Sequence, residues 1–481
     1  MTGAEERYRQ ERIGHWDRVA RESDRRSGLG GAYHRRLERV YRYLIPPGRK
    51  VLELGCGRGD LLAALQPSLG VGIDFSEEML RRASERHPGL RFLQADAHEL
   101  SSLGESLGET FDFIILSDLI NDAWDVQRLL ASLEPLTTPR TRLVLNTYSR
   151  LWELPLALAQ KLGLARPVLY QNWLTVHDVT NLLRLSGFVP VRHWEEVLLP
   201  LPIPLLAPLC NRFLVKLWPF RHLALANFLV ARPAPRPEDT AKDLTVSVIV
   251  PARNEEGNVP AILDRIPEMG RGTEIVFVEG HSKDGTWAAI QREIAARPHL
   301  RTQAFQQTGK GKGDAVRLGF HEASGDVLMI LDADLTVPPE DLPRFYEVIR
   351  SGQGEFVNGV RLVYPMEKDA MRFANLLGNK FFSLAFSWLL GQPIKDTLCG
   401  TKVLRKDDYE QLAADRSYFG DFDPFGDFDL LFGAAKLNLQ LVEVPIRYRE
   451  RTYGETNIQR WRHGWLLLKM CAFAAGRIKF I

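Results

Sequence analysis

The chain alternates short apolar runs with segments of helical periodicity. Before residue 150, each run of β-branched or aliphatic residues is followed by a segment such as Glu77–Glu85, in which apolar positions recur at helical spacing. This alternation predicts parallel strands joined by helices, and hence an α/β fold. The strands predicted in this part are Lys50–Leu54, Gly70–Ile73, Arg91–Gln94, Phe111–Leu116 and Arg142–Asn146.

The same rhythm starts again after a proline-rich interruption. Residues Arg232–Asp239 alternate proline with charge, a pattern typical of a semi-rigid spacer. A chain of 481 residues is also too long for one core. We therefore expect two α/β domains, residues 1–231 and 244–481, joined by a linker at 232–243. The strands predicted after the linker are Ser247–Val250, Glu274–Val278, Asp326–Leu331 and Glu355–Val360.

The composition is that of a globular protein and excludes several partner classes. Hydrophobic residues make up 45% and charged residues 25% of the chain, and the net charge of +2 gives no reason to expect a nucleic-acid partner. The four cysteines lie far apart, which argues against a zinc site or a disulfide framework and favours a reducing cytoplasm. The charged segment Met1–Arg26 does not have the pattern of a signal peptide.

Three apolar segments approach, without reaching, the length of a membrane span. No run has the roughly 20 uninterrupted apolar residues that a spanning helix needs. Val197–Val230 is broken by five prolines, whereas Phe373–Leu390 and Gly464–Gly476 are apolar but carry Lys380 and Lys469. Tryptophan-bearing basic helices suit an anionic lipid interface, but the same pattern fits helices that pack on a sheet. We expect a cytoplasmic protein held peripherally at the cytoplasmic face of a membrane.

A glycine loop follows the first predicted strand. Gly55, Gly57 and Gly59 come directly after Lys50–Leu54, and such a loop lets backbone N–H groups approach a ligand. The dinucleotide fingerprint G-x-G-x-x-G needs a third glycine where this chain has Asp60, which disfavours NAD.

Acidic residues follow the next predicted strands. Asp74 is placed to accept hydrogen bonds from ribose hydroxyls, and Asp96 to accept one from an adenine amine. Asp118 ends the fourth strand, and Asp122 lies shortly after it. Each acid alone also fits a helix cap or a turn. Three acids at successive strand ends behind a glycine loop favour a ligand site.

This stretch, from Arg36 to Asn146 and extensible to Ala231, resembles the class I S-adenosylmethionine-dependent methyltransferases. The resemblance implies a Rossmann-like sheet that binds S-adenosyl-L-methionine. It does not name the methyl acceptor, and the candidate bases also fit structural roles. By the resemblance, Glu53, Gly55 and Gly57 would line the methionine end, Asp74 would hold the ribose, and Asp96 with Ala97 the adenine. The candidate bases are His98, Asp118, Asp122, Tyr148 and His177.

Two carboxylates close a buried strand in the second half. Asp332 and Asp334 are two residues apart at the end of Asp326–Leu331, where they can share one cation. Mg²⁺ or Mn²⁺ prefers carboxylate oxygens and would neutralise a diphosphate leaving group. Lys310 and Lys312, on a glycine-rich segment, add positive charge near phosphates.

With the segments around it, this motif resembles a family 2 inverting glycosyltransferase of the GT-A fold, closest to the dolichyl (polyprenyl) phosphate mannose synthases. The resemblance spans Leu244 to about Tyr453 and implies a nucleotide-sugar donor. It departs from the family at Gly280, where a second acid is usual. By the resemblance, Pro251, Arg253, Glu255 and Glu279 would contact the nucleoside, Lys312 and Asp332 the diphosphate sugar, and Asp332 with Asp334 the metal.

Acceptor-side elements follow further along. Asp396–Lys402 resembles an acceptor-side element of the family, and the basic run after Ile446 resembles the loop that grips an acceptor phosphate. Phe425–Asp429 places two acids before a predicted helix. A lipid phosphate is already ionised and needs no base, whereas a hydroxyl acceptor would make Asp427 or Asp429 the candidate base. The arginines of the basic run are Arg447, Arg449 and Arg451.

Together these features predict a bifunctional enzyme. It would transfer a methyl group from S-adenosylmethionine and, with a metal, a sugar from a nucleotide-sugar to a polyprenyl phosphate or glycolipid. The alternative is a glycosyltransferase with a non-catalytic, S-adenosylmethionine-binding regulatory domain that acts on a hydroxyl acceptor. A third interpretation makes the apolar helices a surface for a separate membrane subunit.

Overall fold

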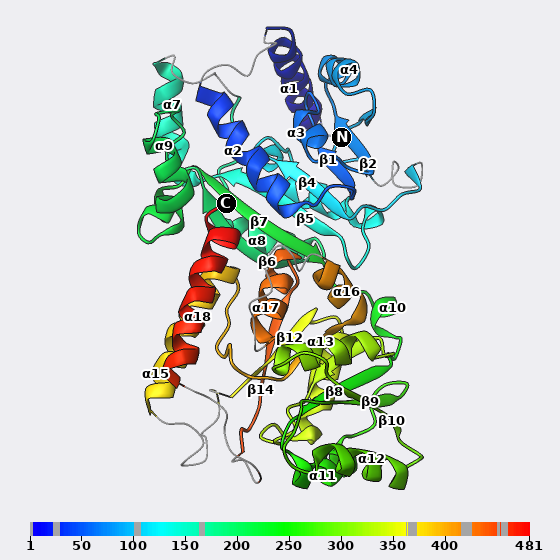
Figure 1. The fold of residues 1–481 in the computed structure, drawn as a ribbon. Coiled ribbons are helices and arrows are strands. Elements are labelled where there is room, and N and C mark those ends of the chain that lie inside the picture. Colours follow the sequence, from blue (N-terminus) through cyan, green and yellow to red (C-terminus); the bar gives the residue numbers. More distant parts are fainter. Residues whose placement is uncertain are drawn as a thin grey trace. The chain divides into compact units, whose positions relative to one another are not determined.

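A computed structural model describes residues 3–22, 29–100, 107–162, 169–361, 363, 373–414, 426–449, 453 and 460–481. The chain divides into two compact units, Met1–Ala234 with Lys479–Ile481 (unit 1) and Pro235–Ile478 (unit 2). Each unit holds one seven-stranded sheet with helices around it, which confirms the predicted two-sheet α/β fold (Figure 1). No helix in the described part of the chain is long and apolar enough to cross a bilayer.

The sheet of unit 1 has the order β3-β2-β1-β4-β5-β7-β6. Strands β1 to β5 pair in parallel, and β7 pairs antiparallel with both β5 and β6. Because parallel strands end at the same edge, the loops after β1 to β5 meet there. The strands are β1 Lys50–Leu54, β2 Leu69–Asp74, β3 Arg91–Gln94, β4 Phe113–Ser117, β5 Arg142–Tyr148, β6 Phe188–Glu196 and β7 Ala226–Pro233.

Helices cover both faces of this sheet. Val51 of β1 packs in one core with Leu37 and Tyr41, whereas its neighbour Leu52 packs in another core with Leu129. This alternation is the period of two expected of a strand that is buried on both faces. The helices of unit 1 are α1 Gly3–Glu22, α2 Leu29–Leu44, α3 Asp60–Ala64, α4 Glu77–Arg86, α6 Val126–Ala131, α7 Glu153–Lys161, α8 Val176–Leu185 and α9 Leu206–Pro208.

The sheet of unit 2 has the order β10-β9-β8-β11-β13-β12-β14, with β13 antiparallel between β11 and β12. Its strands are β8 Val246–Ala252, β9 Thr273–Glu279, β10 Arg301–Gln306, β11 Val327–Ile330, β12 Phe356–Val360, β13 Lys402–Arg405 and β14 Leu441–Pro445. Its helices are α10 Pro237–Thr240, α11 Val259–Arg265, α12 Thr286–Ala296, α13 Lys312–Glu322, α14 Leu342–Arg350, α15 Phe373–Leu390, α16 Lys406–Ala414, α17 Asp427–Lys436 and α18 Arg460–Ala474.

Helices α15 and α18 each have a buried face and an exposed apolar face. Phe386 of α15 and Met470 of α18 are buried in the same core of unit 2. The opposite face of each helix exposes apolar side chains, Leu384 on α15 and Trp465 on α18 among them. These helices therefore pack on their own unit with one face and present an apolar surface with another.

The boundary between the units differs in detail from the predicted linker. Arg232 and Pro233 are buried in β7, where they pair with β6, and residues 237–240 form α10. The N–H of Ala234 donates to the carbonyl of Gly187 (2.8 Å), so pairing continues past Pro233. At the other end, residues 479–481 group with unit 1, where Arg36 Nη1 donates to the carbonyl of Ile481 (2.6 Å).

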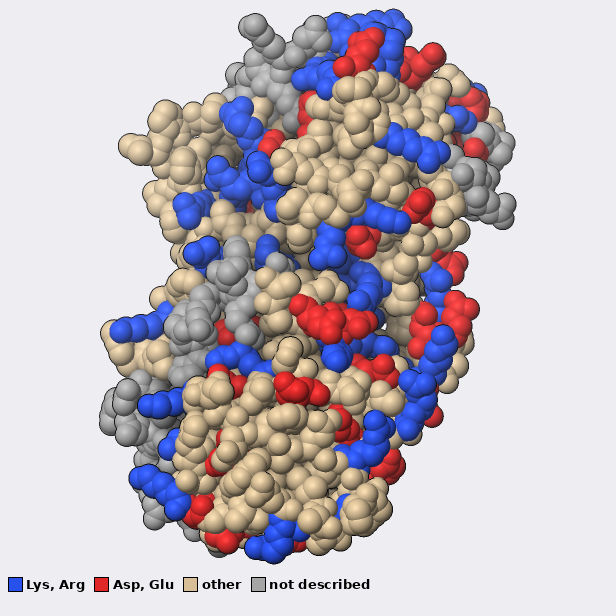
Figure 2. Space-filling view, turned by 45° about the vertical axis from the view of Figure 1, so that its right-hand side comes forward, with Lys and Arg blue, Asp and Glu red and all other residues tan. Residues whose placement is uncertain are grey.

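Charges of both signs are interspersed over the face drawn in Figure 2, as a net charge of +2 leads one to expect. Neither a wholly basic nor a wholly acidic surface is seen on that face.

Candidate active sites

The glycine loop of unit 1 turns sharply at the end of β1. Gly55, Gly57 and Gly59 have φ angles of +69°, +51° and +72°, a region in which other residues are strained. A Cβ atom on Gly59 would lie 2.6 Å from the ring of Phe92, and one on Gly55 would lie 2.9 Å from Leu119 Cδ1. Glycine is therefore required at both positions for conformation and for space.

Asp74, at the end of β2, ties this loop to the next helix. Its Oδ2 accepts a hydrogen bond from the N–H of Gly57 and its Oδ1 one from the N–H of Ser76, each at 2.9 Å. Ser76 in turn caps α4 by accepting from the N–H of Met79 (3.2 Å). Burial raises the pKa of Asp74, against the effect of these N–H groups. Each carboxylate oxygen keeps a second lone pair, so the predicted ribose contact is compatible with this role. Glu53 is buried in β1.

Asp96, just after β3, is engaged by protein groups. Its Oδ1 accepts from the N–H of His98 (2.9 Å) and lies 2.6 Å from His98 Nδ1, and its Oδ2 lies 3.5 Å from Arg9 Nε. Burial raises the pKa of Asp96, but the bonds from His98 and the charge of Arg9 outweigh it, so the pKa lies below its ordinary value. The carbonyl of the neighbouring Ala97 accepts from Ser132 Oγ (3.1 Å).

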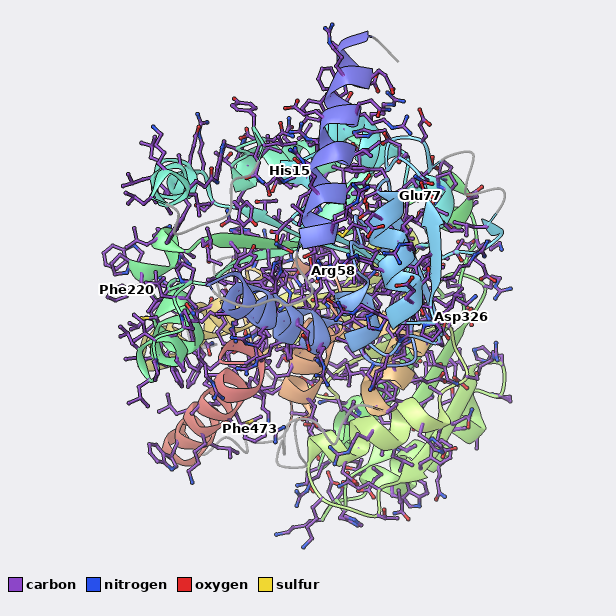
Figure 3. The ribbon with its side chains drawn as sticks, turned by 90° about the horizontal axis from the view of Figure 1, so that it is seen from above. His15, Arg58, Glu77, Phe220, Asp326 and Phe473 are labelled. Carbon is purple, nitrogen blue, oxygen red and sulfur yellow. The ribbon has the colours of Figure 1, made fainter. Side chains whose placement is uncertain are left out.

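Helix α1 lies over these strand ends, which sequence reasoning missed. Arg12 Nε and Trp16 Nε1 both donate to the carboxylate of Asp122, each at 2.9 Å. At the end of the helix, Arg58 Nη2 of the glycine loop donates to the carbonyl of Ala20 (3.2 Å). Figure 3 shows α1 running from the region of His15 towards Arg58. The recurrence of Tyr8, Arg12 and Trp16 at every fourth position is the signal that would have identified this face.

A half-buried acid follows β4 in unit 1. Asp118 adopts a φ of +57°, and its Oδ1 accepts from the hydroxyl of Tyr33 (2.8 Å) and from Asn146 Nδ2 (2.5 Å). Burial raises its pKa to about 7, against the effect of these two donors. The ring of Tyr148 lies 5.8 Å from that of Tyr33, so aromatic side chains border the acid.

The other four candidate bases have different surroundings. His98 is bonded to its neighbouring aspartate, and Asp122 is held by α1. His177 lies exposed on α8, and burial raises the pKa of Tyr148 well above its ordinary value. Of the five, Asp118 combines a position beside Leu119, which packs against Gly55 of the glycine loop, with a pKa near that of a general base.

In unit 2, Asp332 and Asp334 follow β11 and have different partners. Asp332 Oδ1 lies 2.6 Å from Lys312 Nζ at the start of α13. Asp334 Oδ1 accepts from the N–H and the hydroxyl of Thr336 (3.1 and 2.7 Å). Burial raises the pKa of Asp332, but Lys312 and the more distant Lys402 outweigh it, so the carboxyl has a pKa below its ordinary value.

Gly400 packs directly on the Asp332–Lys312 pair. A Cβ atom at this position would lie 2.1 Å from Asp332 Oδ2 and 2.3 Å from Lys312 Nζ. The loop that carries Gly400 is anchored by Asp396, which is fully buried and accepts from Arg361 Nε (2.6 Å) and Nη2 (2.8 Å). The ion pair between Asp396 and Arg361 therefore fixes the loop whose Gly400 packs on Asp332 and Lys312.

Substitution of Asp396 by Asn is expected to destabilise unit 2 by about 3 kcal/mol, because it leaves the Arg361 charge buried without its partner. Burial raises the pKa of Asp396, but Arg361 lowers it below the ordinary 3.8. The stabilisation is then present above about pH 4 and is lost as the pH falls through the lower, folded-state pKa. Calorimetric unfolding of the full chain at several pH values checks this.

The control for this experiment is Asp264→Asn, which removes the exposed partner of Arg297. This variant should unfold like the wild type. An equal loss of stability in the two variants would contradict the importance of the buried pair.

The start of α17, predicted from the sequence to face the acceptor, lies beside the start of α13 in unit 2. Gly426, with a φ of +73°, lies so close to Gly313 that a Cβ atom would be 2.6 Å from the Cα of Gly313. The start of α17, with the buried Asp429, therefore lies beside the start of α13, which carries Lys312. The side chain of Asp427, the first residue of α17, lies outside the described part.

The basic run after β14 passes the same turn. The N–H of Arg449 donates to the carbonyl of Thr336 (3.0 Å), two residues after Asp334. Arg447 and Arg449 are exposed, and Arg451 lies outside the described residues. Beyond it, the ring of Tyr453 approaches Gly257, where a Cβ atom would lie 2.8 Å from Cδ2 of that ring.

Hydrogen bonds join and stabilise the loops after β8 and β9, which are predicted from the sequence to contact the nucleoside. The N–H of Gly280 donates to the carbonyl of Ala252 (2.9 Å), and a Cβ atom on Gly280 would lie 3.3 Å from that of Arg253. Glu279 accepts from the N–H of Ser282 (2.5 Å), and Glu255 from Asn258 Nδ2 (2.8 Å). Glu255 and Glu279 therefore brace the two loops. Pro251 lies in β8, one residue before its end.

The donor set at Asp332 and Asp334 fits a divalent cation bound chiefly by its substrate. The described residues contain no group of three or more His, Cys, Asp or Glu side chains that would enclose a metal. Mg²⁺ is often held by one or two carboxylates, with phosphate oxygens and water as the other ligands. The two carboxylates at the end of β11 can supply such ligands once the ion pair between Asp332 and Lys312 is broken.

Comparison with known proteins gives a separate match for each unit. Residues 247–412 match the family model "Glycosyl transferase family 2", and residues 45–186 match a model described as a methyltransferase domain. The dolichol-phosphate mannosyltransferase of Pyrococcus furiosus is 32% identical over 223 residues, which cover 45% of this chain and 60% of that protein. The undecaprenyl-phosphate mannosyltransferase of Micrococcus luteus is 27% identical over 224 residues, covering 45% of this chain and 88% of that protein.

The chain spans 60% and 61% of the length of the first curated relatives that it matches.

Among solved structures, the chain is similar to glucosyl-3-phosphoglycerate synthase from Mycobacterium tuberculosis, in complex with Mn²⁺, UDP and glucosyl-3-phosphoglycerate. The two are 20% identical with a TM-score of 0.37, and the match covers 50% of this chain and 82% of that one. Magnesium protoporphyrin IX methyltransferase from Synechocystis, with bound SAH, is 18% identical with a TM-score of 0.33, covering 48% and 98%.

Proposed function

We propose that this chain, which joins a methyltransferase domain (residues 45–186) to a family 2 glycosyltransferase domain (residues 247–412), catalyses both methyl transfer and sugar transfer. Unit 2 would transfer a sugar from a nucleotide-sugar to a polyprenyl phosphate or glycolipid. Relatives named for sugar transfer to dolichol phosphate and undecaprenyl phosphate support this acceptor class. We place the protein peripherally at the cytoplasmic face of a membrane, where such acceptors are found.

One observation carries the sugar-transfer proposal: the Asp332–Lys312 pair lies under Gly400 and beside the turn that the Arg449 backbone contacts. In our assignment Asp332 and Asp334 hold the divalent cation, which would supply positive charge to the diphosphate leaving group. Lys312, released from Asp332, would then form an ion pair with the same phosphates. The nucleoside is assigned to Pro251, Arg253, Glu255 and Glu279.

The acceptor phosphate is assigned to the basic run of Arg447, Arg449 and Arg451. Its ionised oxygen attacks the anomeric carbon while the bond to the diphosphate breaks, so no protein group needs to remove a proton. A hydroxyl acceptor would instead require Asp427 or Asp429 as base. Gly426 lies against Gly313, so the start of α17 is close to Lys312 at the start of α13. This proximity supports a hydroxyl compound as the second candidate acceptor.

A donor screen tests the proposal. The full chain is incubated with Mg²⁺ or Mn²⁺, UDP- and GDP-sugars and a short polyprenyl phosphate. Metal-dependent transfer to the lipid supports a phosphate acceptor. Hydrolysis of the donor without glycosylation of the lipid would instead support a hydroxyl acceptor. Asp427 and Asp429 would then be the next residues to substitute.

For unit 1 we propose methyl transfer from S-adenosylmethionine, with Asp118 as the base. Methyl transfer from a sulfonium depends mainly on the alignment of donor and nucleophile. Asp118 lies next to Leu119, whose side chain packs against Gly55 of the glycine loop, so it borders the site where the donor would lie. The donor is assigned to Glu53, Gly55, Gly57, Asp74, Asp96 and Ala97.

Asp118→Asn is expected to lower the rate of methyl transfer about a hundredfold and to remove a rise in rate centred near pH 7. The wild-type rate rises with pH because the base must lose its proton. Folding raises this pKa from 3.8 to about 7, so the free energy of unfolding falls as the pH rises between these values, a fall that the variant lacks. Release of S-adenosylhomocysteine gives the rate, and calorimetry gives the stability.

The matched control for Asp118 is Asp112→Asn, at the opposite end of β4. This variant should keep the wild-type pH profile. An unchanged profile in Asp118→Asn would rule out this base.

The second candidate function for unit 1 is a regulatory domain that binds S-adenosylmethionine without turnover. The observation that favours it is the cover formed by α1, together with the bonds that His98 and Arg9 make to Asp96. Binding of the donor without release of S-adenosylhomocysteine, across a panel of lipid acceptors, would support this function over catalysis.

A further inference from the structure

Unit 1 carries an apolar surface that neither proposed reaction uses. More than half of the large apolar side chains that are exposed in the described part of the chain lie in residues 151–162 and 201–223. We name these two segments the apolar face. Its most exposed members include Leu205 (89% exposed), Leu154 (80%) and Trp218 (76%). An exposed apolar surface of this extent marks an interaction site.

The two segments form one surface. Trp152 Nε1, just before α7, donates to the carbonyl of Leu223 (2.9 Å), at the end of the second segment. Figure 1 draws α7 and α9 next to each other at one margin of unit 1, and Figure 3, from above, shows Phe220 at the same margin with α7 nearby. Residues from both segments can therefore contact one flat partner.

The polar groups of the second segment are used internally. Asn211 Oδ1 accepts from the N–H of Leu199 and Asn211 Nδ2 donates to its carbonyl, both at 2.7 Å. The ammonium group of Lys216 is buried and pairs with Glu196 of β6. Pro200, Pro202, Pro204 and Pro208 have no N–H to satisfy. Such a face can enter a lipid interface without leaving many backbone donors unpaired.

The charges around the apolar face favour a lipid partner with negative headgroups. Residues 201–223 contain no Asp or Glu, and the first segment contains one acid, Glu153. Exposed basic residues flank the apolar ones: Arg150 and Lys161 at the ends of the first segment, and Arg212 within the second. Apolar side chains with a basic border and an exposed tryptophan are the pattern of an interfacial membrane surface.

We propose that the apolar face docks unit 1 on an anionic lipid bilayer. The face lies close to the surroundings of Asp118: Tyr148 ends β5 beside Tyr33, and the N–H of the next residue, Ser149, donates to the carbonyl of Leu225 (2.7 Å), two residues after the face. The inference rests on the proposed function in one respect, the peripheral position of the protein at a membrane. Docking itself is measured without either activity.

Co-sedimentation of the full chain with vesicles tests the proposal. The wild type is expected to bind phosphatidylcholine vesicles that contain phosphatidylglycerol, and to bind pure phosphatidylcholine less well. Leu154→Glu combined with Leu205→Glu should weaken binding about tenfold or more, because two inserted leucines become charged. The control is Leu185→Glu at the end of α8, an exposed leucine outside the face, which should bind like the wild type. Equal binding of the double variant and the wild type overturns the proposal.

Fluorescence quenching locates the contact. Brominated phosphatidylcholine, mixed with phosphatidylglycerol, should quench a component of the emission that is present in the wild type and absent in Trp218→Phe. If the quenched emission is the same in the two proteins, Trp218 does not enter the bilayer and the proposal fails. It also fails if the wild type does not bind vesicles while the double variant converts a dimer to a monomer in light scattering, since the face would then join two copies. Vesicle binding without methyl transfer would leave docking intact and remove the proposed reaction of unit 1.

Discussion

Asp332→Asn is expected to reduce sugar transfer about a thousandfold, the effect of losing several kcal/mol of charge stabilisation on the leaving diphosphate. The variant keeps the size and shape of the side chain, so Gly400 can still pack against it. It removes the negative charge that pairs with Lys312 at 2.6 Å. The measurement is the rate of sugar transfer to polyprenyl phosphate over a range of Mg²⁺ or Mn²⁺ concentrations.

The control for this variant is Asp341→Asn, an acid of the same unit that pairs with Arg344 near the start of α14. It should transfer sugar like the wild type. Thermal unfolding of both variants separates lost chemistry from lost folding. If Asp332→Asn retains most of the activity at every metal concentration, the cation is not held at this position and our assignment of unit 2 is wrong.

Asp74→Ala is expected to weaken the binding of S-adenosylmethionine about a hundredfold, because one buried and one half-buried N–H group lose their acceptor at roughly 1–3 kcal/mol each. The groups are those of Gly57 and Ser76, so the glycine loop and the start of α4 lose their common anchor. Removal of the proposed hydrogen bonds to the ribose hydroxyls would add to the effect. Isothermal titration with S-adenosylmethionine measures the affinity.

The comparison for Asp74 is Glu77→Ala, an exposed acid in the first turn of the same helix, labelled in Figure 3. This change should leave the affinity unaltered. Sugar transfer by Asp74→Ala is informative as well: if it falls together with donor binding in unit 1, the regulatory alternative gains support. Unchanged affinity in Asp74→Ala would place the S-adenosylmethionine site elsewhere.

Much of each sheet could be predicted because the strands are short and the central ones are apolar and largely buried. Lys50–Leu54 and Arg91–Gln94 are found with the predicted bounds. Strand β6 was missed because it mixes polar and apolar residues and contains Pro190, and β7 because its last residues belong to the proline-rich segment. Their pairing is set by long-range contacts that no local pattern records.

The positions of the site acids could be anticipated, but their partners could not. A strand end followed by Asp332 and Asp334 is visible in the sequence. The approach of Gly400 to Lys312, or of Gly426 to Gly313, joins residues that are distant along the chain. Likewise, the spacing of Tyr8, Arg12 and Trp16 marks one face of α1, but it does not name Asp122 as the partner of that face, because charged residues on a helix usually face solvent.

The ion pair between Lys312 and Asp332 has a thermodynamic consequence: it couples the binding of the cation to that of the nucleotide-sugar. Lys312 is the counter-ion of Asp332, so a cation bound at the position that we propose would have to displace it. A nucleotide diphosphate offers the displaced ammonium group a new partner, so each ligand lowers the cost of binding the other. Such coupling is reciprocal: the donor raises the affinity for the cation by the same factor as the cation raises the affinity for the donor. The two should therefore enter the site as a pair.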